Sequence, residues 1–379
     1  MPDLQHFDAI VVGAGVFGIS TALELARRGR KVATIDRFGS GHPATSSTGA
    51  SRSIRVAYAQ PFYVSLALEA IDSWRRLEAA TGRRILHLTG QVDLGPSAFL
   101  GELARAVRHA GAAIEELEAR DLRRRFPELA VLADEGGLFH ADAGTVMAEE
   151  GLRGLNEAAA AGGVTLFSPE RAMRIAPGRL TTVETDRRTL QAEHIVIAAG
   201  PWSGRLLADL GMALPLAPAI AQVTFLDAPD LVGRPGIAEW QSVGNGGVYG
   251  HPVPGIGYKI AFDAGAPGWL PDVEEWVPDL DEERRILAWL AARMPEAPRR
   301  VARTQRHPWT MTPDADFVVD RRDAITVACG CSGHAFKFGP ALGRLVADVV
   351  DGGDAPELLR LDRPGLHQPA PSPMAPIIR

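Results

Sequence analysis

The chain has 379 residues, more than one compact core normally holds, and we expect two domains. Hydrophobic residues make up 46% of the sequence and charged residues 23%, which is typical of a soluble globular protein. The formal net charge of −6 argues against nucleic acid or an anionic membrane surface as the main partner. The two cysteines, Cys329 and Cys331, are too few for a disulfide framework or a cysteine-based zinc site. No signal-peptide pattern precedes the first predicted strand, so a cytoplasmic protein is expected. No metal site is predicted.

The first predicted unit is a strand, a glycine turn, a helix and a second strand. The run at 9–12 is short, apolar and β-branched, as in a buried parallel strand, and 19–28 has helical composition. The second strand is expected at 32–35. This order is typical of the first half of a nucleotide-binding sheet.

The glycines between the first strand and the helix have the G-x-G-x-x-G spacing. Gly13 makes the turn, and Gly15 lets the backbone approach a pyrophosphate. Gly18 lets the helix pack close to the sheet, so that its N-terminal N–H groups point at phosphate. Asp36, at the end of the second strand, is placed to accept hydrogen bonds from a ribose. The sequence therefore predicts a dinucleotide site, and this unit alone does not separate NAD from FAD.

A loop rich in Gly, Ser and Thr follows at 39–55 and contains Arg52 and Arg55. Arginines before a helix are often solvated, but a long loop of small residues beside a dinucleotide site is suited to lining the ligand. Helices are then expected over 63–80, 97–110, 119–125, 147–161 and 281–293. Strands are expected at 85–94, 164–167, 171–175, 180–184, 195–198, 317–320 and 325–328, with an antiparallel sheet within 216–270.

Near the C-terminus a second glycine loop opens a helix, over 330–350, and the tail from 364 is expected to be loosely ordered. Six motifs thus occur along the chain in the order GAGVFG, SRSIR, AAGPWS, GYK, PDADFVVD and GCSGHAFKFGPALG. In this order and spacing the sequence resembles the FAD-dependent D-amino-acid oxidase superfamily. Within it, the chain is most similar to the monomeric sarcosine oxidase and N-methyltryptophan oxidase group, over residues 6 to 360 or so. The resemblance implies FAD, because an NAD-dependent dehydrogenase would leave the SGHAFKF block unexplained.

The implied fold is α/β with an α+β second domain. A discontinuous, Rossmann-like FAD-binding domain is expected from 1–85, 140–215 and 305–365. It is interleaved with a sheet-rich substrate domain from 86–139 and 216–304, and 366–379 forms a loosely ordered tail.

The resemblance also implies roles for four cations. Arg52 matches a family arginine beside the flavin, and Arg55 matches one that clamps the substrate carboxylate. Lys337 matches a lysine that shares this clamp, and a guanidinium fork with an ammonium charge is well suited to a carboxylate. Lys259 matches a lysine near the flavin that activates oxygen, where a cation stabilises negative charge developing on O2.

Three further residues have two interpretations each. Tyr249 aligns with a substrate-pocket tyrosine or is a packed, half-buried side chain. Asp263 stands where the sarcosine-oxidase pattern has a pocket histidine, or is a surface residue shifted by an insertion. In the pocket it would attract an ammonium group, which favours a substrate larger or more basic than sarcosine. His334 is expected to orient the backbone of its glycine loop rather than to act in catalysis.

The family cysteine that carries the flavin covalently is replaced by His307, and neither Cys329 nor Cys331 fills that position. Non-covalent FAD is therefore predicted, with a histidyl linkage through His307 as the alternative. Cys331 is expected to be a small buried residue. The full set of predicted cofactor-binding residues is Gly13, Gly15, Val16, Phe17, Gly18, Asp36, Arg37, Ser47, Thr48, Ser51, Arg52, Ala172, Ala199, Gly200, Trp202, His307, Gly330, Gly333, His334, Phe336 and Lys337.

The predicted function is the FAD-dependent oxidation of a secondary amino acid, N-methylated or cyclic, to an imine, with O2 reduced to H2O2. The partners are then a small amino-acid substrate and O2, and the chain is a monomer or a small homo-oligomer. Two alternatives are a dehydrogenase of the same fold with another electron acceptor and a flavoprotein without turnover. Loss of Lys259 would have favoured the first, and loss of the carboxylate clamp the second.

Overall fold

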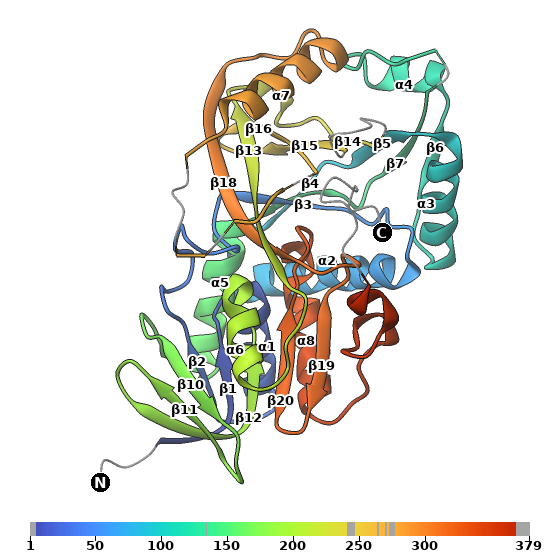
Figure 1. Ribbon diagram of the computed structural model, residues 1–379. Coiled ribbons are helices and arrows are strands. Elements are labelled where there is room, and N and C mark those ends of the chain that lie inside the picture. Colours follow the sequence, from blue (N-terminus) through green and yellow to red (C-terminus); the bar gives the residue numbers. More distant parts are fainter. Residues whose placement is uncertain are drawn as a thin grey trace.

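The computed structural model describes residues 5–133, 135–240, 247–263, 265–269, 271–272 and 277–368. Figure 1 shows two parts, a largely parallel sheet packed with helices and a second, mostly antiparallel sheet beside it. The predicted α/β fold class is confirmed. The predicted domain ranges stay a prediction, although the first sheet draws its strands from 5–35, 165–197 and 318–329.

The first sheet has the strand order β10-β11-β12-β1-β2-β9, with β20 beside β12 and β19 beside β20. β9, β2, β1, β12 and β20 run parallel, and β19 and the β10–β11 hairpin are antiparallel. The bounds are β1 (Gln5–Val12), β2 (Val32–Ile35), β9 (Thr165–Phe167), β10 (Ala172–Ala176), β11 (Thr181–Thr185), β12 (Thr189–Ile197), β19 (Val318–Arg322) and β20 (Ile325–Cys329).

Both faces of this sheet are buried, because alternate residues of β1 enter different hydrophobic clusters. Ala9 and Val11 pack under α1 (Val16–Arg27), α2 (Pro61–Thr81), α5 (Ala148–Ala161) and α8 (Gly339–Val350). Ile10 and Val12 enter the cluster that α6 (Ser203–Asp209) helps to cover. A Cβ atom at Gly343 would lie 2.5 Å from the backbone of α1, so this glycine lets α8 lie against α1.

The second sheet has the order β17-β13-β16-β15-β14-β5-β7-β6, with β18 beside β13. One of its faces is hydrophobic and is covered by α4 (Ala119–Arg125) and α7 (Leu280–Arg293), and α3 (Ser97–His109) packs near β5 and β7. The bounds are β5 (Gln91–Gly95), β6 (Glu115–Leu117), β7 (Gly136–His140), β13 (Ala217–Leu226), β14 (Gly236–Glu239), β15 (Val248–Val253), β16 (Gly257–Phe262), β17 (Ala266–Pro267) and β18 (Val301–Met311).

A third, small sheet joins β3 (Ser51–Ile54), β8 (Gly144–Met147) and β4 (Leu86–Leu88). The predicted loop at 39–55 is therefore wrong at its end, since Ser51–Ile54 pairs with β8. The single strand predicted at 85–94 is also wrong, because β4 and β5 belong to different sheets. Gly90 separates them with a φ of +81°, a left-handed conformation that favours glycine.

The sequence analysis missed β18, which pairs with β13 along its length. Its Arg and Gln residues and Pro308 hide the alternating apolar pattern of a strand. The predicted helix at 119–125 matches α4 residue for residue. The loosely ordered tail predicted from 364 is wrong at its start, because Pro364–His367 is a 3-10 helix with Leu366 fully buried. The part of the predicted tail from 369 lies outside the described residues. No helix in the described ranges is long and apolar enough to cross a membrane.

Candidate active site

The alternation of side chains along β16 decides which residue it presents to the interior. Tyr258 and Ile260 belong to the hydrophobic cluster that α7 covers, so Lys259 between them points to the opposite face. His251 lies directly across the β15–β16 pair from Lys259 and points the same way. Both basic side chains are buried, with 2% and 0% of their surface exposed. The inner face of the second sheet therefore carries buried nitrogen-containing side chains beside the apolar residues Val223, Phe225 and Ala261.

A cleft with about 1590 Å³ of empty volume lies between this inner face and the carboxyl ends of the parallel strands. In open parallel sheets the carboxyl ends of the strands are where ligands bind. From the first sheet the lining includes Val12, Gly13, Ile35, Asp36, Ala198, Ala199, Gly200, Cys329 and Gly330. From the second sheet it includes Ala221, Val223, Tyr249, Lys259, His307 and Trp309.

The glycine turn after β1 has no room for side chains. Gly13 has a φ of +103°, and a Cβ atom there would lie 2.3 Å from the carbonyl oxygen of Ala198. A Cβ atom at Gly18 would lie 1.8 Å from the carbonyl oxygen of Gly13, so Gly18 lets α1 pack against the turn. Gly18 is not among the residues that line the cleft. The Val16 N–H at the start of α1 donates to Ser47 Oγ at 3.0 Å. The helix N-terminus thus lies at the cleft wall, where its dipole favours an anion.

The carboxylate of Asp36 is held by backbone N–H groups and lines the cleft. Oδ2 accepts from the Ala14 N–H at 2.7 Å, and Oδ1 accepts from the N–H groups of Phe38 and Gly39 at 3.0 and 2.8 Å. A carboxylate offers about four acceptor positions, so capacity for a further donor is left. The role predicted for Asp36 at a ribose remains a proposal.

At the rim of the cleft, Arg37 donates to both carboxylate oxygens of Asp272, at 2.7 and 2.8 Å. The Trp202 indole N–H donates to the same carboxylate at 3.2 Å, and the Arg37 guanidinium lies 4.7 Å from the centre of the Phe38 ring. Arg37, Phe38 and Trp202 line the cleft, as does Ala172 at the start of β10. This rim joins the segment after β2 to the segment after β17.

The cleft fits a dinucleotide with a polar ring system. Three buried polar atoms of lining residues have no hydrogen-bond partner in the described structure: Ser46 Oγ, His307 Nδ1 and Trp309 Nε1. Lining residues Gly330 and Gly333 both have positive φ, and a Cβ atom at Gly333 would lie 2.4 Å from the Trp309 ring. Polar atoms without partners beside backbone that lacks side chains are what a tightly bound cofactor would complement.

A second cavity, with about 610 Å³ of empty volume, adjoins the cleft and shares lining residues with it. The shared residues are Arg52, Tyr249, Lys259, Gly333 and Phe336. All six residues that the sequence analysis assigned to catalysis line this second cavity: Arg52, Arg55, Tyr249, Lys259, Asp263 and Lys337. We call it the substrate pocket below.

Arg55 and Lys337 bring two cations to one side of the substrate pocket. The Arg55 guanidinium lies between the rings of Tyr58 and Trp240, 4.2 and 4.9 Å from their centres, and donates to the Ala57 carbonyl. Lys337 Nζ lies 6.0 Å from the same Tyr58 ring. Burial, with repulsion from Arg55, lowers the pKa of Lys337 well below the ordinary lysine value. Such a pair attracts an anion strongly, because an anion relieves both the repulsion and the loss of solvation.

Arg52 and Lys259 lie where the pocket meets the cleft. Lys259 Nζ donates to the Ser51 carbonyl at 3.0 Å, and the Arg52 guanidinium donates to the carbonyls of Ser46, Thr48 and Ser51 at 2.7–2.9 Å. Thr48 and Ser51 thus hold these cations through their carbonyls and do not line the cleft. Burial, with repulsion from Arg52, lowers the pKa of Lys259 well below the ordinary value.

Asp263 and Tyr249 add an acid and a phenol to the pocket. Burial raises the pKa of Asp263 to about 6, against the lowering effect of Arg55 and Lys337. Burial and the Asp263 charge raise the pKa of Tyr249, so its hydroxyl keeps its proton. The pocket therefore presents two cations, one carboxylate and one hydroxyl to a ligand.

His334 supports the pocket from behind. Its Nε2 lies 3.2 Å from the Ala315 carbonyl, which places the ring proton on that nitrogen. Its ring packs 4.5 Å from the Phe317 ring, and its own carbonyl accepts from Lys337 Nζ at 2.8 Å. His334 lines the substrate pocket rather than the larger cleft, as does Lys337.

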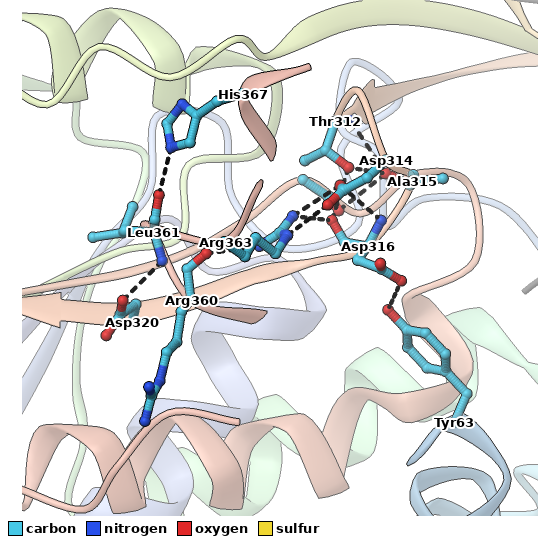
Figure 2. Close-up of polar contacts among 12 residues, drawn as sticks. Tyr63, Thr312, Asp314, Ala315, Asp316, Asp320, Arg360, Leu361, Arg363 and His367 are labelled. Carbon is cyan, nitrogen blue, oxygen red and sulfur yellow. Dashed lines mark hydrogen bonds and ion pairs between the residues drawn. The ribbon is translucent and has the colours of Figure 1, made fainter. Parts of the chain in front are cut away.

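The loop at 312–316 that contacts His334 is itself held from two sides, as Figure 2 shows. The Tyr63 hydroxyl donates to Asp316 Oδ1 at 2.9 Å. On the other side Arg363 donates to both carboxylate oxygens of Asp314, at 2.6 and 3.0 Å. Both partners of this ion pair are buried, with 6% and 8% exposed.

Sequence reasoning missed several lining residues. Gln91 and Trp240 line the substrate pocket, and Thr45, Ser46 and Trp309 line the cleft. Gln91 and Trp240 belong to no recognisable motif, and their place depends on the pairing of β5 with β14. Thr45 and Ser46 lie in the small-residue loop that was expected to line the ligand. Cys331, expected to be a small buried residue, is half-buried, lines the cleft and accepts from the Thr310 N–H at 3.3 Å.

Comparisons with known proteins agree with this geometry. Residues 8–349 match a family described as FAD dependent oxidoreductase. Human peroxisomal sarcosine oxidase is 30% identical over 359 residues, which cover 90% of this chain and 92% of that protein. The N-methyl-L-tryptophan oxidase of Salmonella arizonae is 30% identical over 369 residues, covering 91% and 95%. The structure of NikD, described as an unusual amino acid oxidase essential for nikkomycin biosynthesis, has a TM-score of 0.81 at 26% identity, covering 92% of this chain and 94% of NikD.

Proposed function

The chain belongs to the family of FAD-dependent oxidoreductases, and on this premise we propose that it oxidises a secondary amino acid to an imine while O2 is reduced to H2O2. The similar proteins are named as oxidases of sarcosine and of N-methyl-L-tryptophan, which are both N-methyl amino acids. The observation that carries the proposal is the substrate pocket, which Arg55 and Lys337 line and which shares five lining residues with the large cleft.

The chain's own residues would orient the substrate. Arg55 and Lys337 hold the carboxylate, the first as a planar fork and the second as a point charge. With the carboxylate fixed there, the carbon beside the amine would face the side of the pocket that adjoins the cleft, where Tyr249 and Phe336 line both cavities. FAD bound in the cleft supplies the acceptor for the hydride lost from that carbon. No side chain is assigned as a base, so the amine reacts in its neutral form, and water hydrolyses an acyclic imine product.

Lys259 and Arg52 would assist the reduction of oxygen. Both are basic groups at the junction of pocket and cleft, and a cation there stabilises negative charge that develops on O2. Burial lowers the pKa of Lys259, and negative charge in the cleft would favour its protonated form.

We propose that FAD is held without a covalent bond. His307 occupies the position of the family's flavin-linking cysteine, and burial lowers its pKa well below the ordinary histidine value, which leaves a neutral imidazole at the cleft wall. Acid precipitation of the yellow protein should then leave the colour in the supernatant. Colour that stays in the pellet of the wild type but not of His307→Ala would instead establish the histidyl linkage.

Asp263 supports a substrate larger or more basic than sarcosine, because its carboxylate lines the pocket and attracts an ammonium group. We expect Asp263→Asn to lower kcat/KM for a basic N-methyl amino acid by about 10- to 100-fold, the effect of losing a hydrogen bond to a charged group. In both enzymes kcat/KM should fall toward low pH, because the substrate amine reacts in its neutral form. In the wild type the fall for that substrate should steepen below a pH of about 6, where Asp263 gains its proton, and this steepening should be absent in the Asn variant.

The control for Asp263 is sarcosine, which carries no second ammonium group, and its kcat/KM should change by less than a factor of a few. Asp263→His restores the residue of the sarcosine-oxidase pattern and should shift preference toward sarcosine. If both variants keep the wild-type preference between sarcosine and the basic N-methyl amino acid, Asp263 does not select the substrate.

The function itself is tested by mixing the yellow holoenzyme anaerobically with sarcosine, proline, pipecolate, N-methyltryptophan and basic N-methyl amino acids. One of them should bleach the flavin absorbance near ~450 nm, and air should restore the colour with formation of peroxide. Bleaching with poor recovery in air would identify a dehydrogenase with another acceptor. No bleaching by any compound would contradict the proposed substrate class.

A further inference from the structure

A buried carboxylate lies directly behind one wall of the substrate pocket. Asp93, in the middle of β5, has no exposed surface. It accepts from His140 Nε2 at 2.7 Å, from Trp240 Nε1 at 3.0 Å and from Gln91 Nε2 at 3.1 and 3.2 Å. Three donors around one carboxylate compensate the burial of its charge.

Strand alternation puts this cluster on the inner face of the second sheet. Val92 and Leu94 enter the hydrophobic cluster under α7, so Gln91 and Asp93 point the other way, toward the pocket. His140 lies across the β5–β7 pair from Gln91 and points the same way. The cluster therefore stands between the strands of the sheet and the pocket.

Two of the three donors are pocket walls. Gln91 and Trp240 line the substrate pocket, while Asp93 and His140 do not. The Gln91 amide nitrogen donates to Asp93, so the Gln91 side-chain carbonyl oxygen is the atom that can accept a hydrogen bond from a ligand. Asp93 thus fixes both the position of the indole and the orientation of the amide.

The Trp240 ring also determines where Arg55 lies. The guanidinium is held between Trp240 and Tyr58, with ring centres 4.9 and 4.2 Å away. Arg55 has no carboxylate within ion-pair distance in the described ranges, so its direct contacts are with these two rings and the Ala57 carbonyl, while the charge of Asp263 acts on it from across the pocket. If the Trp240 ring were free to rotate, the Arg55 guanidinium would lose its contact with one of the two rings.

We infer that Asp93 is a positioning residue for substrate recognition, which holds Trp240 against Arg55 and turns the Gln91 carbonyl toward the ligand. Asp93 does not touch the substrate. The inference rests on the proposed function, because Arg55 is the carboxylate clamp only in that proposal. The inference adds that one buried carboxylate, Asp93, determines both the position of Arg55 and the orientation of the Gln91 carbonyl, which would accept from a substrate N–H group.

The test uses Asp93→Asn in the holoenzyme and titration with pyrrole-2-carboxylate, a secondary-amine carboxylate that this reaction cannot oxidise, followed by the flavin spectrum. An asparagine has one acceptor oxygen where aspartate has two, so the Gln91 amide nitrogen, which donates to both oxygens of Asp93, would face an N–H group on one side. We expect the Kd of the probe to rise by about tenfold or more, the typical effect of losing hydrogen bonds to a charged group, while FAD content stays the same.

Two further variants separate positioning from general loosening. Trp240→Phe keeps a ring over Arg55 but cannot donate to Asp93, and the Kd should rise several-fold even if Asp93→Asn fails to fold. His140→Gln alters the donor that lies outside the pocket, and it should lower thermal stability while the Kd changes by less than a factor of two. Equal weakening by His140→Gln and Asp93→Asn would make the cluster merely structural and overturn the inference.

The outcomes also distinguish this inference from the proposed function. If the wild type binds pyrrole-2-carboxylate and both Asp93→Asn and Trp240→Phe bind it equally well, only the positioning role fails. If the wild type does not bind the probe at all, the carboxylate clamp itself is wrong, and the inference fails with it.

Discussion

Replacement of Lys259 by Met should slow reoxidation of the reduced enzyme by O2 about 10²- to 10³-fold, the usual effect of removing a group that stabilises charge developing in a reaction. Lys259 is 2% exposed and lies where the pocket meets the cleft. Its Nζ is held by one bond to the Ser51 carbonyl, so the ammonium keeps two N–H groups for oxygen. Methionine has similar length and no charge, and therefore fills the space without the cation.

The measurement is stopped-flow mixing of anaerobically reduced enzyme with buffer of known O2 concentration. The reductive half-reaction with substrate is the internal control, and its rate should change far less, because Lys259 is not part of the carboxylate clamp. His251, buried opposite Lys259 on β15, offers a matched variant. His251→Asn should leave reoxidation within about tenfold of the wild type, because the pKa of His251 is lowered by burial and its ring carries no charge. Unchanged reoxidation in Lys259→Met would assign oxygen activation to another group.

The same cation gives a pH dependence with a definite sign. Burial lowers the pKa of Lys259, so the protonated form is lost at lower pH than for an exposed lysine. Reoxidation of the wild type should therefore become slower as the pH rises, with a midpoint below the ordinary lysine range. This limb should be absent in Lys259→Met.

Replacement of Arg363 by Met should destabilise the protein by about 3–5 kcal/mol, because it leaves the Asp314 carboxylate buried without its cation. Arg363 donates to both oxygens of Asp314 and to the Asp316 carbonyl at 3.0 Å. Figure 2 shows how these bonds fasten the C-terminal segment to the loop at 312–316. The loop contacts His334 through the Ala315 carbonyl, so FAD retention and the affinity for carboxylates should weaken as well.

Urea denaturation of the holoenzyme, followed by far-UV circular dichroism, measures the effect on stability. The matched control is Arg360→Met, since the Arg360 guanidinium is half-buried and donates to the Ala355 carbonyl, and surface changes of this kind usually stay within about 0.5 kcal/mol. The double variant Arg363→Met with Asp314→Asn removes both charges of the ion pair and should recover much of the lost stability. A single Arg363→Met variant as stable as Arg360→Met would show that the buried pair contributes little.

Local sequence patterns were sufficient to predict the strand, glycine turn, helix and second strand of the nucleotide-binding unit. Glycine is required at both positions because a Cβ atom would clash: at Gly13 it would lie 2.3 Å from the Ala198 carbonyl oxygen, and at Gly18 it would lie 1.8 Å from the Gly13 carbonyl oxygen. The apolar run of β1 is buried on both faces because parallel strands are covered by helices on both sides. The glycine spacing and the apolar run fall within about thirty residues and are therefore visible in the sequence, although the contact that requires Gly13 comes from the distant Ala198.

The resemblance to the family implied that the six predicted residues share one site, but their separation along the chain does not by itself show that they converge. Arg55 follows β3, Asp263 follows β16, and Lys337 precedes α8. They meet because the inner face of the second sheet lies against the carboxyl ends of the first. The predicted loop ending at Arg55 was wrong for the same reason, since β3 is a strand only through its pairing with β8.

The sequence by itself determined the fold class, the dinucleotide turn and the residue types that suit an amino-acid carboxylate. Only the tertiary structure decided that Gln91 and Trp240 wall the substrate pocket and that Asp93 and Arg363 support it from behind. The physical reason is the range of the interactions. Turns and strand alternation depend on neighbours in the chain, whereas a buried carboxylate is stabilised by donors from distant strands, which only the pairing of the sheets brings together.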